Sequence, residues 1–330
     1  MGQSVARRMR ALYFEKTGSL DELKLGLRPW PELKPGEALV QVHRAAINPS
    51  DVKNVLGRFP FTTLPRIPGR DFAGAVLKGP PDLIGREVFA SPPGAGFTRD
   101  GAQAEIIAVP AESLALKPSR ISFEQAAGLG VPFTTAWQSL FTAGGLKEGE
   151  TVLILGAGGA VGSAAARLAK TKRAKIIGTL SKASGLDRVK ALPVDHWVAL
   201  DREDLVLRVK ELTEGRGAEL VFDTVGPPLF EAGLKSLARR GRQVCIAAAP
   251  GTPVSFNLAD FYHQEATLKG VDSLKLSFQE SGDILRELAK LIEMGKVEAP
   301  EVEVIAYEEA PAAYARMNEG QTRVKQVIRF

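Results

Sequence analysis

A chain of 330 residues exceeds the size at which one hydrophobic core stops growing, so two domains are expected. Its net charge of +5 is spread along the sequence without a basic block, and nucleic-acid backbones are bound by clustered Lys and Arg, so no nucleic-acid partner is expected. The single cysteine, Cys245, excludes an internal disulfide and any multi-cysteine metal site, and it favours a reducing compartment. No apolar run approaches the roughly 18 residues of a membrane span, and the first ten residues lack the apolar stretch of a signal peptide. We therefore expect a cytoplasmic protein with no membrane segment.

The region from residue 10 to about 122 is predicted to be rich in β-strands. Short runs of branched and alternating apolar residues are separated by turns with Pro and Gly, such as Lys34-Pro35-Gly36. The runs are ALYFE, EALVQVHRAAI, DFAGAVL, REVFAS and AEIIAVP. Because no helical periodicity interrupts them, a small barrel or sandwich is favoured.

The pattern changes at Ser122, where Ser122-Phe123-Glu124-Gln125 matches a capping box that opens a helix. Beyond residue 150, apolar strands alternate with segments long enough for a helix and its return. The strands are predicted at 151–155, 175–180, 196–200, 219–225, 242–247 and 267–271. Near-continuous apolar strands are typical of a parallel sheet covered on both faces, and six of them make a doubly wound α/β domain.

A last helical run at 282–295 is followed by two strand-like segments, VEVIAY and VKQVIRF. We expect these segments to rejoin the N-terminal β domain, which makes the α/β domain an insertion. The predicted domains are residues 1–122 with 297–330, and residues 123–296.

A glycine-rich turn directly after the strand TVLIL is the strongest functional signal. It reads Gly156-Ala157-Gly158-Gly159-Ala160-Val161-Gly162 and runs into a helix that begins with small residues. Glycines let the backbone approach a pyrophosphate, and the free amides and positive end of the helix bind the anion. At the start of a six-strand series this turn predicts a dinucleotide-binding loop; a purely structural turn is the alternative.

The end of the second α/β strand indicates which dinucleotide is bound. NAD sites usually place an acid there for the ribose 2′-hydroxyl, whereas this chain has Thr179, Ser181 and Lys182 before its first acid, Asp187. Hydroxyls and an ammonium suit a 2′-phosphate, so NADPH is favoured over NADH. The alternative is that Lys182 is simply a solvated loop residue.

From residue 10 to its end the chain resembles the zinc-independent medium-chain dehydrogenases/reductases, in the branch of quinone oxidoreductases and enone reductases. Five motifs carry the resemblance: AAINPSD (45–51), PGRDFAG (68–74), GVPFTTAW (130–137), GETVL (149–153) and DTVG (223–226). It implies a six-stranded Rossmann domain inserted in a GroES-like β-barrel catalytic domain. It also implies a reduced nicotinamide as hydride donor and a homodimer formed through residues near 242–280.

The resemblance also implies that no metal takes part. Zinc-dependent relatives carry a ligand cysteine at the position of Asn48 and a Gly-His-Glu at the position of Gly69-Arg70-Asp71. Without those ligands an alcohol cannot be activated as an alkoxide. The expected acceptors are therefore a quinone or the C=C bond of an α,β-unsaturated carbonyl compound, which are already electron-poor.

Site residues follow from the resemblance by position. Asn48 is expected to donate to the substrate oxygen as enolate charge develops, with a turn residue before Pro49 as the alternative. Asp51 is expected to orient the site, and Thr135 to contact the nicotinamide ribose. Lys53 is a candidate for polarising the carbonyl or protonating the enolate, although a solvated helix lysine explains it equally well.

Further cofactor contacts are expected after the fourth and fifth α/β strands. They are Thr224, Val225 and Gly226, and then Ala247 and Ala248 in the segment 247–251.

Two positions bear on the alternatives. Phe59 stands where 2-enoyl thioester reductases have a proposed proton-donating Tyr, which disfavours that activity, and Gln103 stands where relatives commonly have Tyr. We also hypothesise that Phe97, in the Pro- and Gly-rich segment 91–100, covers a substrate. The competing functions are a 2-enoyl thioester reductase and a non-catalytic NADPH-binding protein that acts as a sensor or binds RNA.

Overall fold

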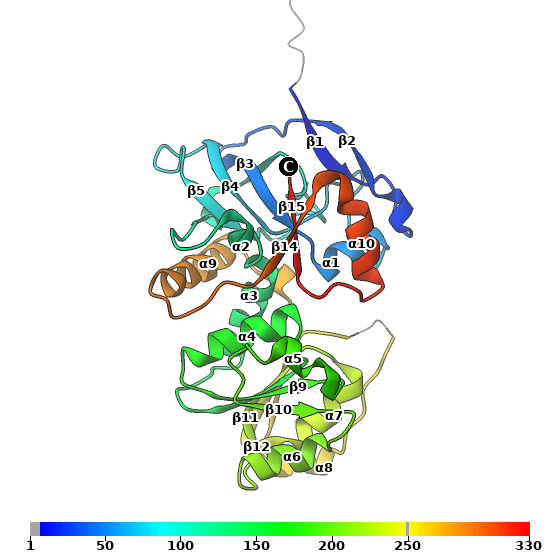
Figure 1. Cartoon of the computed structure of the whole chain (residues 1–330), viewed down its shortest axis with the longest axis vertical. Helices are drawn as coiled ribbons and strands as arrows, with labels where there is room; N and C mark the ends of the chain where they lie inside the picture. The colour runs from blue at the N-terminus through cyan, green and yellow to red at the C-terminus, as the bar shows by residue number, and fades with distance from the viewer. Residues whose placement is uncertain (1–6, 249–250) are drawn as a thin grey trace, which may run out of the picture. The chain divides into compact units, whose positions relative to one another are not determined.

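The computed structural model describes residues 7–248 and 251–330, which divide into two compact units (Figure 1). The first unit contains the described residues up to Thr134 together with Leu274–Phe330, and the second contains Thr135–Ser273. The chain thus enters and leaves the second unit once, which makes that unit an insertion in the first.

The second unit is a doubly wound parallel sheet. Six described strands pair in the order β10-β9-β8-β11-β12-β13, and every pairing is parallel. The strands are β8 (Thr151–Leu155), β9 (Lys175–Leu180), β10 (His196–Ala199), β11 (Ala218–Asp223), β12 (Leu237–Cys245) and β13 (Thr267–Gly270). This order confirms the predicted six-stranded Rossmann domain.

Helices connect these strands and complete the apolar core. They are α4 (Ala160–Lys170), α5 (Leu186–Val189), α6 (Leu205–Leu212), α7 (Pro227–Lys235) and α8 (Leu258–His263). Leu153, Ile177 and Val221 from three adjacent strands lie in one buried cluster with Val209 of α6. β12 begins at Leu237, earlier than the predicted residue 242, because Leu237 already pairs with Ala218 before a register shift.

The first unit is built around β3 (Glu37–Ala46), which pairs with three strands. β4 (Phe72–Lys78), β6 (Ile106–Pro110) and β15 (Lys325–Arg329) all run antiparallel to it. Figure 1 shows the C-terminal β15 beside β3, so the predicted return of the last segments to the N-terminal domain is confirmed. The sheet is extended by β5 (Glu87–Ala90), β7 (Ala115–Leu116) and β14 (Val302–Ala306), while β1 (Arg8–Tyr13) pairs with β2 (Lys24–Pro29).

Two short helices, α1 (Pro49–Val55) and α10 (Ala310–Asn318), pack against each other beside this sheet. α1 follows β3 directly in the chain. α10 connects β14 to β15 in the chain and contacts α1. The fully buried Tyr314 of α10 lies in one cluster with Val52 and Val55 of α1. None of the helices within residues 7–248 and 251–330 combines the length and apolarity required to cross a bilayer.

Helices α2 (Phe123–Ala127) and α9 (Phe278–Glu293) group with the first unit, whereas the predicted segmentation at 122/123 and 296/297 assigned both to the α/β domain. The contacts of α9 give the physical reason. Ser281 Oγ donates to Ser91 O at 2.9 Å, and Arg286 Nη1 donates to Glu112 O at 2.9 Å and to Leu114 O at 2.8 Å. These bonds satisfy backbone carbonyls of the first unit, so α9 belongs with its sheet.

Candidate active site

The glycine-rich turn of the second unit links β8 to the N-terminus of α4. Gly159 is the N-cap of α4, and Gly158, Gly159 and Ala160 are exposed. A Cβ on Gly162 would overlap the carbonyl oxygen of Gly156, so only glycine lets the helix approach the turn this closely. The exposed amides at the start of an eleven-residue helix suit a bound pyrophosphate, and the loop therefore fits the dinucleotide that its sequence predicts.

Two threonines that are predicted to contact the cofactor form hydrogen bonds that hold this loop in place. Thr179 is only 1% exposed, and its hydroxyl accepts from the backbone N–H of Gly156 at 2.9 Å. Thr224 Oγ1 donates to Leu155 O at 2.7 Å. Both hydroxyls thus satisfy backbone groups at the carboxyl end of β8, which is a supporting role for the same site.

The Asp223 carboxylate holds the turn after β11. Asp223 Oδ1 accepts from the N–H groups of Val225 at 2.9 Å and Gly226 at 2.8 Å. Val225 is exposed and Thr224 is half-buried, so this turn offers surface at the carboxyl edge of the sheet. Open α/β sheets bind ligands at this edge, at the point where the strand order reverses between β8 and β11.

Cations gather after β9, including one that the sequence analysis missed. Ser181 and Lys182 are exposed, as predicted for residues that meet a 2′-phosphate. The guanidinium of Arg188 lies against the same loop, because a Cβ on Gly185 would be 3.2 Å from Arg188 Nη2. A second basic residue six positions after Lys182 is the sequence signal that would have revealed it.

The remaining predicted contacts of the second unit lie after β12 and on α3. Ala247 is half-buried and Ala248 exposed directly after β12, whereas residues 249 and 250 of the predicted segment lie outside the described residues. Thr135, on α3 (Gly130–Trp137), donates its Oγ1 hydrogen to Ser273 Oγ at 3.0 Å. Its hydroxyl therefore ties α3 to the end of the inserted unit.

In the first unit, Asn48 lies at the start of α1 within a buried polar cluster. Its backbone N–H donates to Asp51 Oδ2 at 2.8 Å, and its side-chain Nδ2 donates to Asp71 Oδ2 at 2.9 Å. Its Oδ1 accepts a hydrogen bond from Lys325 Nζ. The amide of Asn48 thus has two charged partners, Asp71 and Lys325. Both lie far from Asn48 in the sequence, so the sequence does not indicate these contacts.

Asp71 is the centre of this cluster. Its Oδ1 accepts from the backbone N–H of Val131 at 2.9 Å, and its Oδ2 lies 3.5 Å from Lys325 Nζ. A Cβ on Gly130 would overlap the Asp71 carboxylate, so the GVPFTTAW motif needs glycine at its first position. The carboxylate therefore joins β4, α1, the N-terminus of α3 and β15.

The ionisation of the cluster follows from its burial. Burial, together with the nearby Asp71 carboxylate, raises the pKa of Asp51 to about 7. Burial lowers the pKa of Lys325, although Asp71 and Asp51 oppose that shift. Burial also raises the pKa of the Tyr314 phenol well above its ordinary value. Within the described residues Asp51 Oδ1 accepts no hydrogen bond, which is consistent with a carboxyl that retains a proton.

The other positions singled out in the first unit lie outside this cluster or support it. Lys53 is exposed in the last turn of α1, where a cation interacts favourably with the helix dipole. Phe97 is fully buried, edge-on to Phe59 with 5.1 Å between ring centroids, so it does not lie open over a substrate. Gln103 accepts from Tyr314 Oη at 2.7 Å and donates to Ala46 O at 3.2 Å, which fixes the end of β3.

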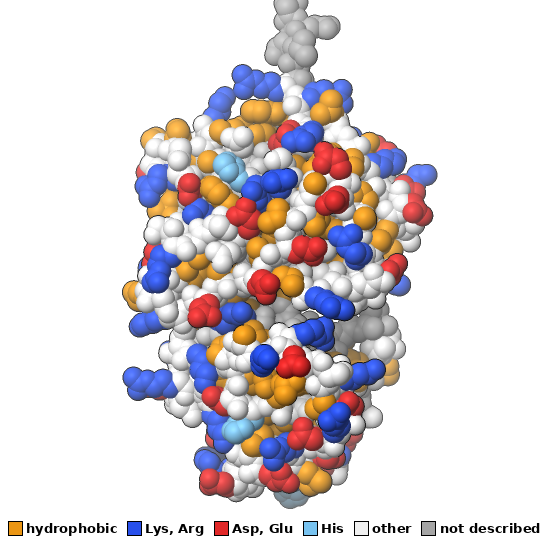
Figure 2. Space-filling view, in the orientation of Figure 1, with side chains coloured by type: hydrophobic (Ala, Val, Ile, Leu, Met, Phe, Trp, Pro, Cys, Tyr) orange, Lys and Arg blue, Asp and Glu red, His pale blue; other side chains and the backbone are white. Residues whose placement is uncertain are grey.

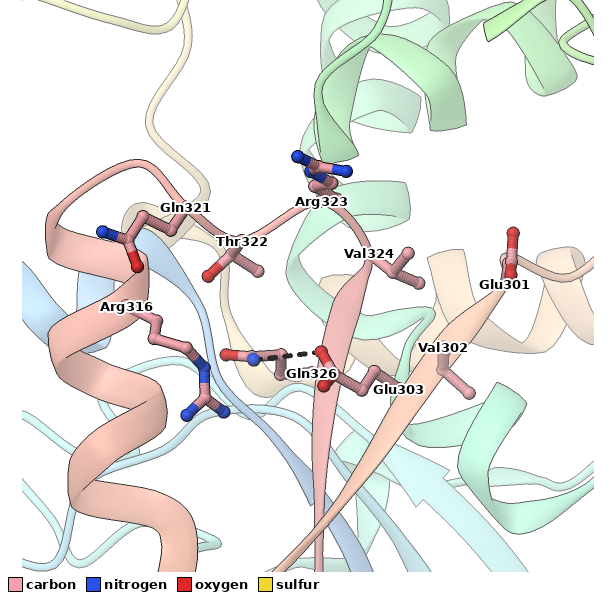
Figure 3. A pocket seen from close by; sticks show the side chains of 9 residues that line it. All are labelled: Glu301, Val302, Glu303, Arg316, Gln321, Thr322, Arg323, Val324 and Gln326. Atoms are coloured by element: carbon pink, nitrogen blue, oxygen red, sulfur yellow. Dashed lines mark hydrogen bonds between the residues drawn. The ribbon is translucent and has the colours of Figure 1, made fainter. Parts of the chain in front are cut away.

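A separate cavity of about 470 Å³ lies between β14, β15 and the end of α10 (Figure 3). Gln326 Nε2 donates to Glu303 Oε2 at 3.1 Å at its floor, and Arg316 and Thr322 line one side. None of the predicted site residues lines this cavity. It is therefore not the site that the motifs indicate.

A Rossmann sheet with a glycine loop, in one chain with a β-rich unit that carries a buried polar cluster, defines a nicotinamide-dependent oxidoreductase. Comparisons with known proteins agree. The family model described as Alcohol dehydrogenase GroES-like domain matches residues 34–119, and the one described as Zinc-binding dehydrogenase matches residues 160–291.

Individual relatives identify the branch. A zinc-type alcohol dehydrogenase-like protein of Schizosaccharomyces pombe is 38% identical over 292 residues, which cover 87% of this chain and 85% of that protein. The chloroplastic NADPH-dependent alkenal/one oxidoreductase of Arabidopsis thaliana is 31% identical over 305 residues, or 89% of this chain and 72% of that protein. The solved quinone oxidoreductase of Pseudomonas syringae has a TM-score of 0.85 at 27% identity and covers 98% of this chain and 100% of its own. The chain belongs to the medium-chain dehydrogenase/reductase family, in its quinone oxidoreductase and enone reductase branch.

The residues at the start of α1 and β4 do not fit the zinc ion that one family description names. Asn48 offers a carboxamide and Arg70 a guanidinium, while Asp71 already contacts the Lys325 ammonium. Zinc in proteins is bound by thiolate, imidazole and unpaired carboxylate groups. Across residues 7–248 and 251–330 no three His, Cys, Asp or Glu side chains form a group that could hold a metal ion.

The raised pKa of Asp51 predicts a pH dependence of stability. From about pH 4 to pH 7 the unfolded chain loses this proton while the folded chain keeps it, so the free energy of unfolding falls as the pH rises. The slope due to one group is at most about 1.4 kcal/mol per pH unit. Asp51→Asn stays neutral, so we expect it to flatten this fall, measured by urea unfolding across the window. The exposed Asp187→Asn is the control, and parallel curves for D51N and wild type would contradict the prediction.

Proposed function

We propose that this protein is an NADPH-dependent, zinc-free reductase that transfers hydride to quinones or to the C=C bond of α,β-unsaturated carbonyl compounds. The observation that carries the proposal is the buried contact of Asn48 with Asp71 and Lys325, which puts an ammonium beside two positions that the resemblance aligns with zinc-ligand motifs of metal-using relatives. The printed activities of the Arabidopsis and Pseudomonas relatives belong to those proteins and support the same class of acceptor.

The proposed chemistry gives separate roles to the cofactor and to the residues of the chain. When bound, the reduced nicotinamide supplies the hydride. The glycine loop binds the pyrophosphate of the cofactor, and Asn48 donates an N–H to the acceptor oxygen as negative charge develops there. Lys53, exposed later on α1, is a second candidate for polarising the acceptor carbonyl.

The preference for NADPH is supported by the charges after β9. Lys182 and Arg188 bring two cations to the loop, and Ser181 adds a hydroxyl. The nearby Asp201 carboxylate accepts from the backbone N–H of Ala183 at 2.9 Å, which holds the loop rather than offering an acid at the end of β9. These groups together suit a phosphate dianion better than a ribose hydroxyl.

The non-catalytic alternative has less support. On the face drawn in Figure 2, Lys and Arg side chains alternate with Asp and Glu instead of forming a continuous basic stripe. RNA backbones require such a stripe. We also propose the cytoplasm as the compartment, because the single half-buried Cys245 suits a reducing environment.

Turnover tests the proposal directly. NADPH oxidation is followed with a panel of quinones, enones and 2-enoyl thioesters, and we expect quinones and enones to be reduced. Thioesters should react slowest, because Phe59 carries no transferable proton. Gly162→Val, which blocks the close approach of α4 to the loop, should abolish both NADPH binding and turnover. Tight NADPH binding by wild type with no acceptor reduced would instead support the non-catalytic alternative.

Charge reversal tests the cofactor. Lys182→Glu should weaken NADPH binding by about tenfold or more, because a carboxylate repels the 2′-phosphate, and should leave NADH binding unchanged or tighter. Dissociation constants from nicotinamide fluorescence provide the measurement. Lys210→Glu, at an exposed position on α6, is the matched control. Equal affinity of K182E and wild type for NADPH would refute the phosphate argument.

Self-association is a further proposal. We propose a homodimer through the edge strand β13, all of whose residues are exposed, together with the exposed Leu258 and Tyr262 of α8. An open sheet edge flanked by apolar side chains favours pairing with a second copy. Light scattering should give a dimer for wild type and a monomer for Leu268→Lys. Leu207→Lys, at an exposed apolar position on α6, should remain dimeric, and a monomeric wild type would contradict the proposal.

A further inference from the structure

Lys325 is a buried cation that the chemistry described so far does not use. Its side chain is 7% exposed, and that of Asp71, 3.5 Å away, is fully buried. Lysine is almost never buried without a partner, and here both of its contacts are oxygens of the candidate site, Asn48 Oδ1 and Asp71 Oδ2. The Lys325 ammonium is therefore kept beside Asn48 by its pairing with the Asp71 carboxylate.

These two contacts fix the orientation of the Asn48 amide. An ammonium only donates hydrogen bonds and an ionised carboxylate only accepts them, so Lys325 must face Oδ1 and Asp71 must face Nδ2. A flipped amide would set two donors together on one side and two acceptors together on the other. Nδ2 carries two N–H groups and Asp71 accepts from one of them, so the amide has a second N–H that can donate.

The contact with Lys325 also makes the amide a better donor. A cation at the carbonyl oxygen withdraws electron density from the nitrogen, and hydrogen-bonded groups polarise one another in a low-dielectric site. A preorganised donor of this kind stabilises charge that develops in the transition state without reorganisation.

We propose that Lys325 is a positioning residue of the reduction: together with Asp71 it fixes and polarises the Asn48 carboxamide, whose remaining N–H donates to the acceptor oxygen. The inference rests on the proposed function. It differs from a purely structural role, in which Lys325 only neutralises the buried carboxylates Asp71 and Asp51.

Enones and quinones should respond differently. Hydride addition to an enone leaves an enolate oxygen that needs stabilisation, whereas a quinone is electron-poor enough to need less. We expect Lys325→Met to lower kcat for enones about 100-fold and for quinones less, with the Kd for NADPH unchanged. Asn48→Ala should produce the same pattern, and its effect should not add to that of K325M.

A charge-balanced variant separates the two roles. K325M alone leaves a buried carboxylate without its cation and is expected to lose stability. Asp71→Asn combined with K325M removes both charges, so it should regain thermal stability while the kcat for enones stays low. Ethylammonium added to Lys325→Ala should restore part of the enone kcat, because it returns a cation to the same place.

Lys117→Met is the matched control for burial. The Lys117 side chain is also 7% exposed and ion-paired, to Glu87, in the same unit. This variant should lose stability but keep its kcat for both acceptors. An enone kcat of D71N/K325M within threefold of wild type would overturn the proposal. Failure of wild type to reduce any acceptor would instead contradict the proposed function, so the two failures are distinguishable.

Discussion

The contact between Asp71 and Lys325 is the constraint on which the first unit depends. A fully buried carboxylate is stable only if each of its oxygens finds a donor or a cation, and the three donors to Asp71 come from three other parts of the chain. They are the side chain of Asn48, the backbone of Val131 and the C-terminal Lys325. The start of α1, the start of α3 and β15 are therefore held in register by one charge, and losing any donor leaves part of that charge unsatisfied.

Local patterns predicted most of the fold because the interactions behind them are local. The six parallel strands were identified by their apolar runs, and the helix at Ser122 by its capping box, in which Ser122 Oγ accepts from Gln125 N at 3.2 Å. The predicted domain of α9 differs from the unit in which the structure places it. The reason is that α9 binds backbone carbonyls of Ser91 and Glu112, and the helical pattern of its sequence does not indicate these partners. Helix periodicity indicates that a face is buried but not which unit buries it.

The candidate site shows the same limit more sharply. Lys325 lies 277 positions from Asn48, and within VKQVIRF it has the pattern of a solvent-facing residue in a half-buried strand. Thr179 was predicted to face a phosphate because it lies near the end of a strand. Successive side chains of a strand point to opposite faces, and that of Thr179 is turned inward to Gly156. Motifs thus identified the backbone elements of the site, whereas side-chain partners required the sheet register.

An internal ammonium limits the chemistry in a way that an exchangeable metal does not. The charge of Lys325 is tethered and already directed at two oxygens, so it cannot bind and deprotonate an alcohol as a metal with an open coordination position does. The ammonium can only orient and polarise the side chains that it already contacts, Asn48 and Asp71. The charges of Asp71, Lys325 and Arg70 all act on Asp51, whose pKa is raised to about 7. A buried cation stabilises negative charge on an oxygen beside it, whether that oxygen belongs to an acceptor that gains hydride or to an alkoxide that loses it. The proposed reduction of a carbonyl-conjugated acceptor needs only this stabilisation, whereas oxidation of an alcohol would also need a group that removes the hydroxyl proton.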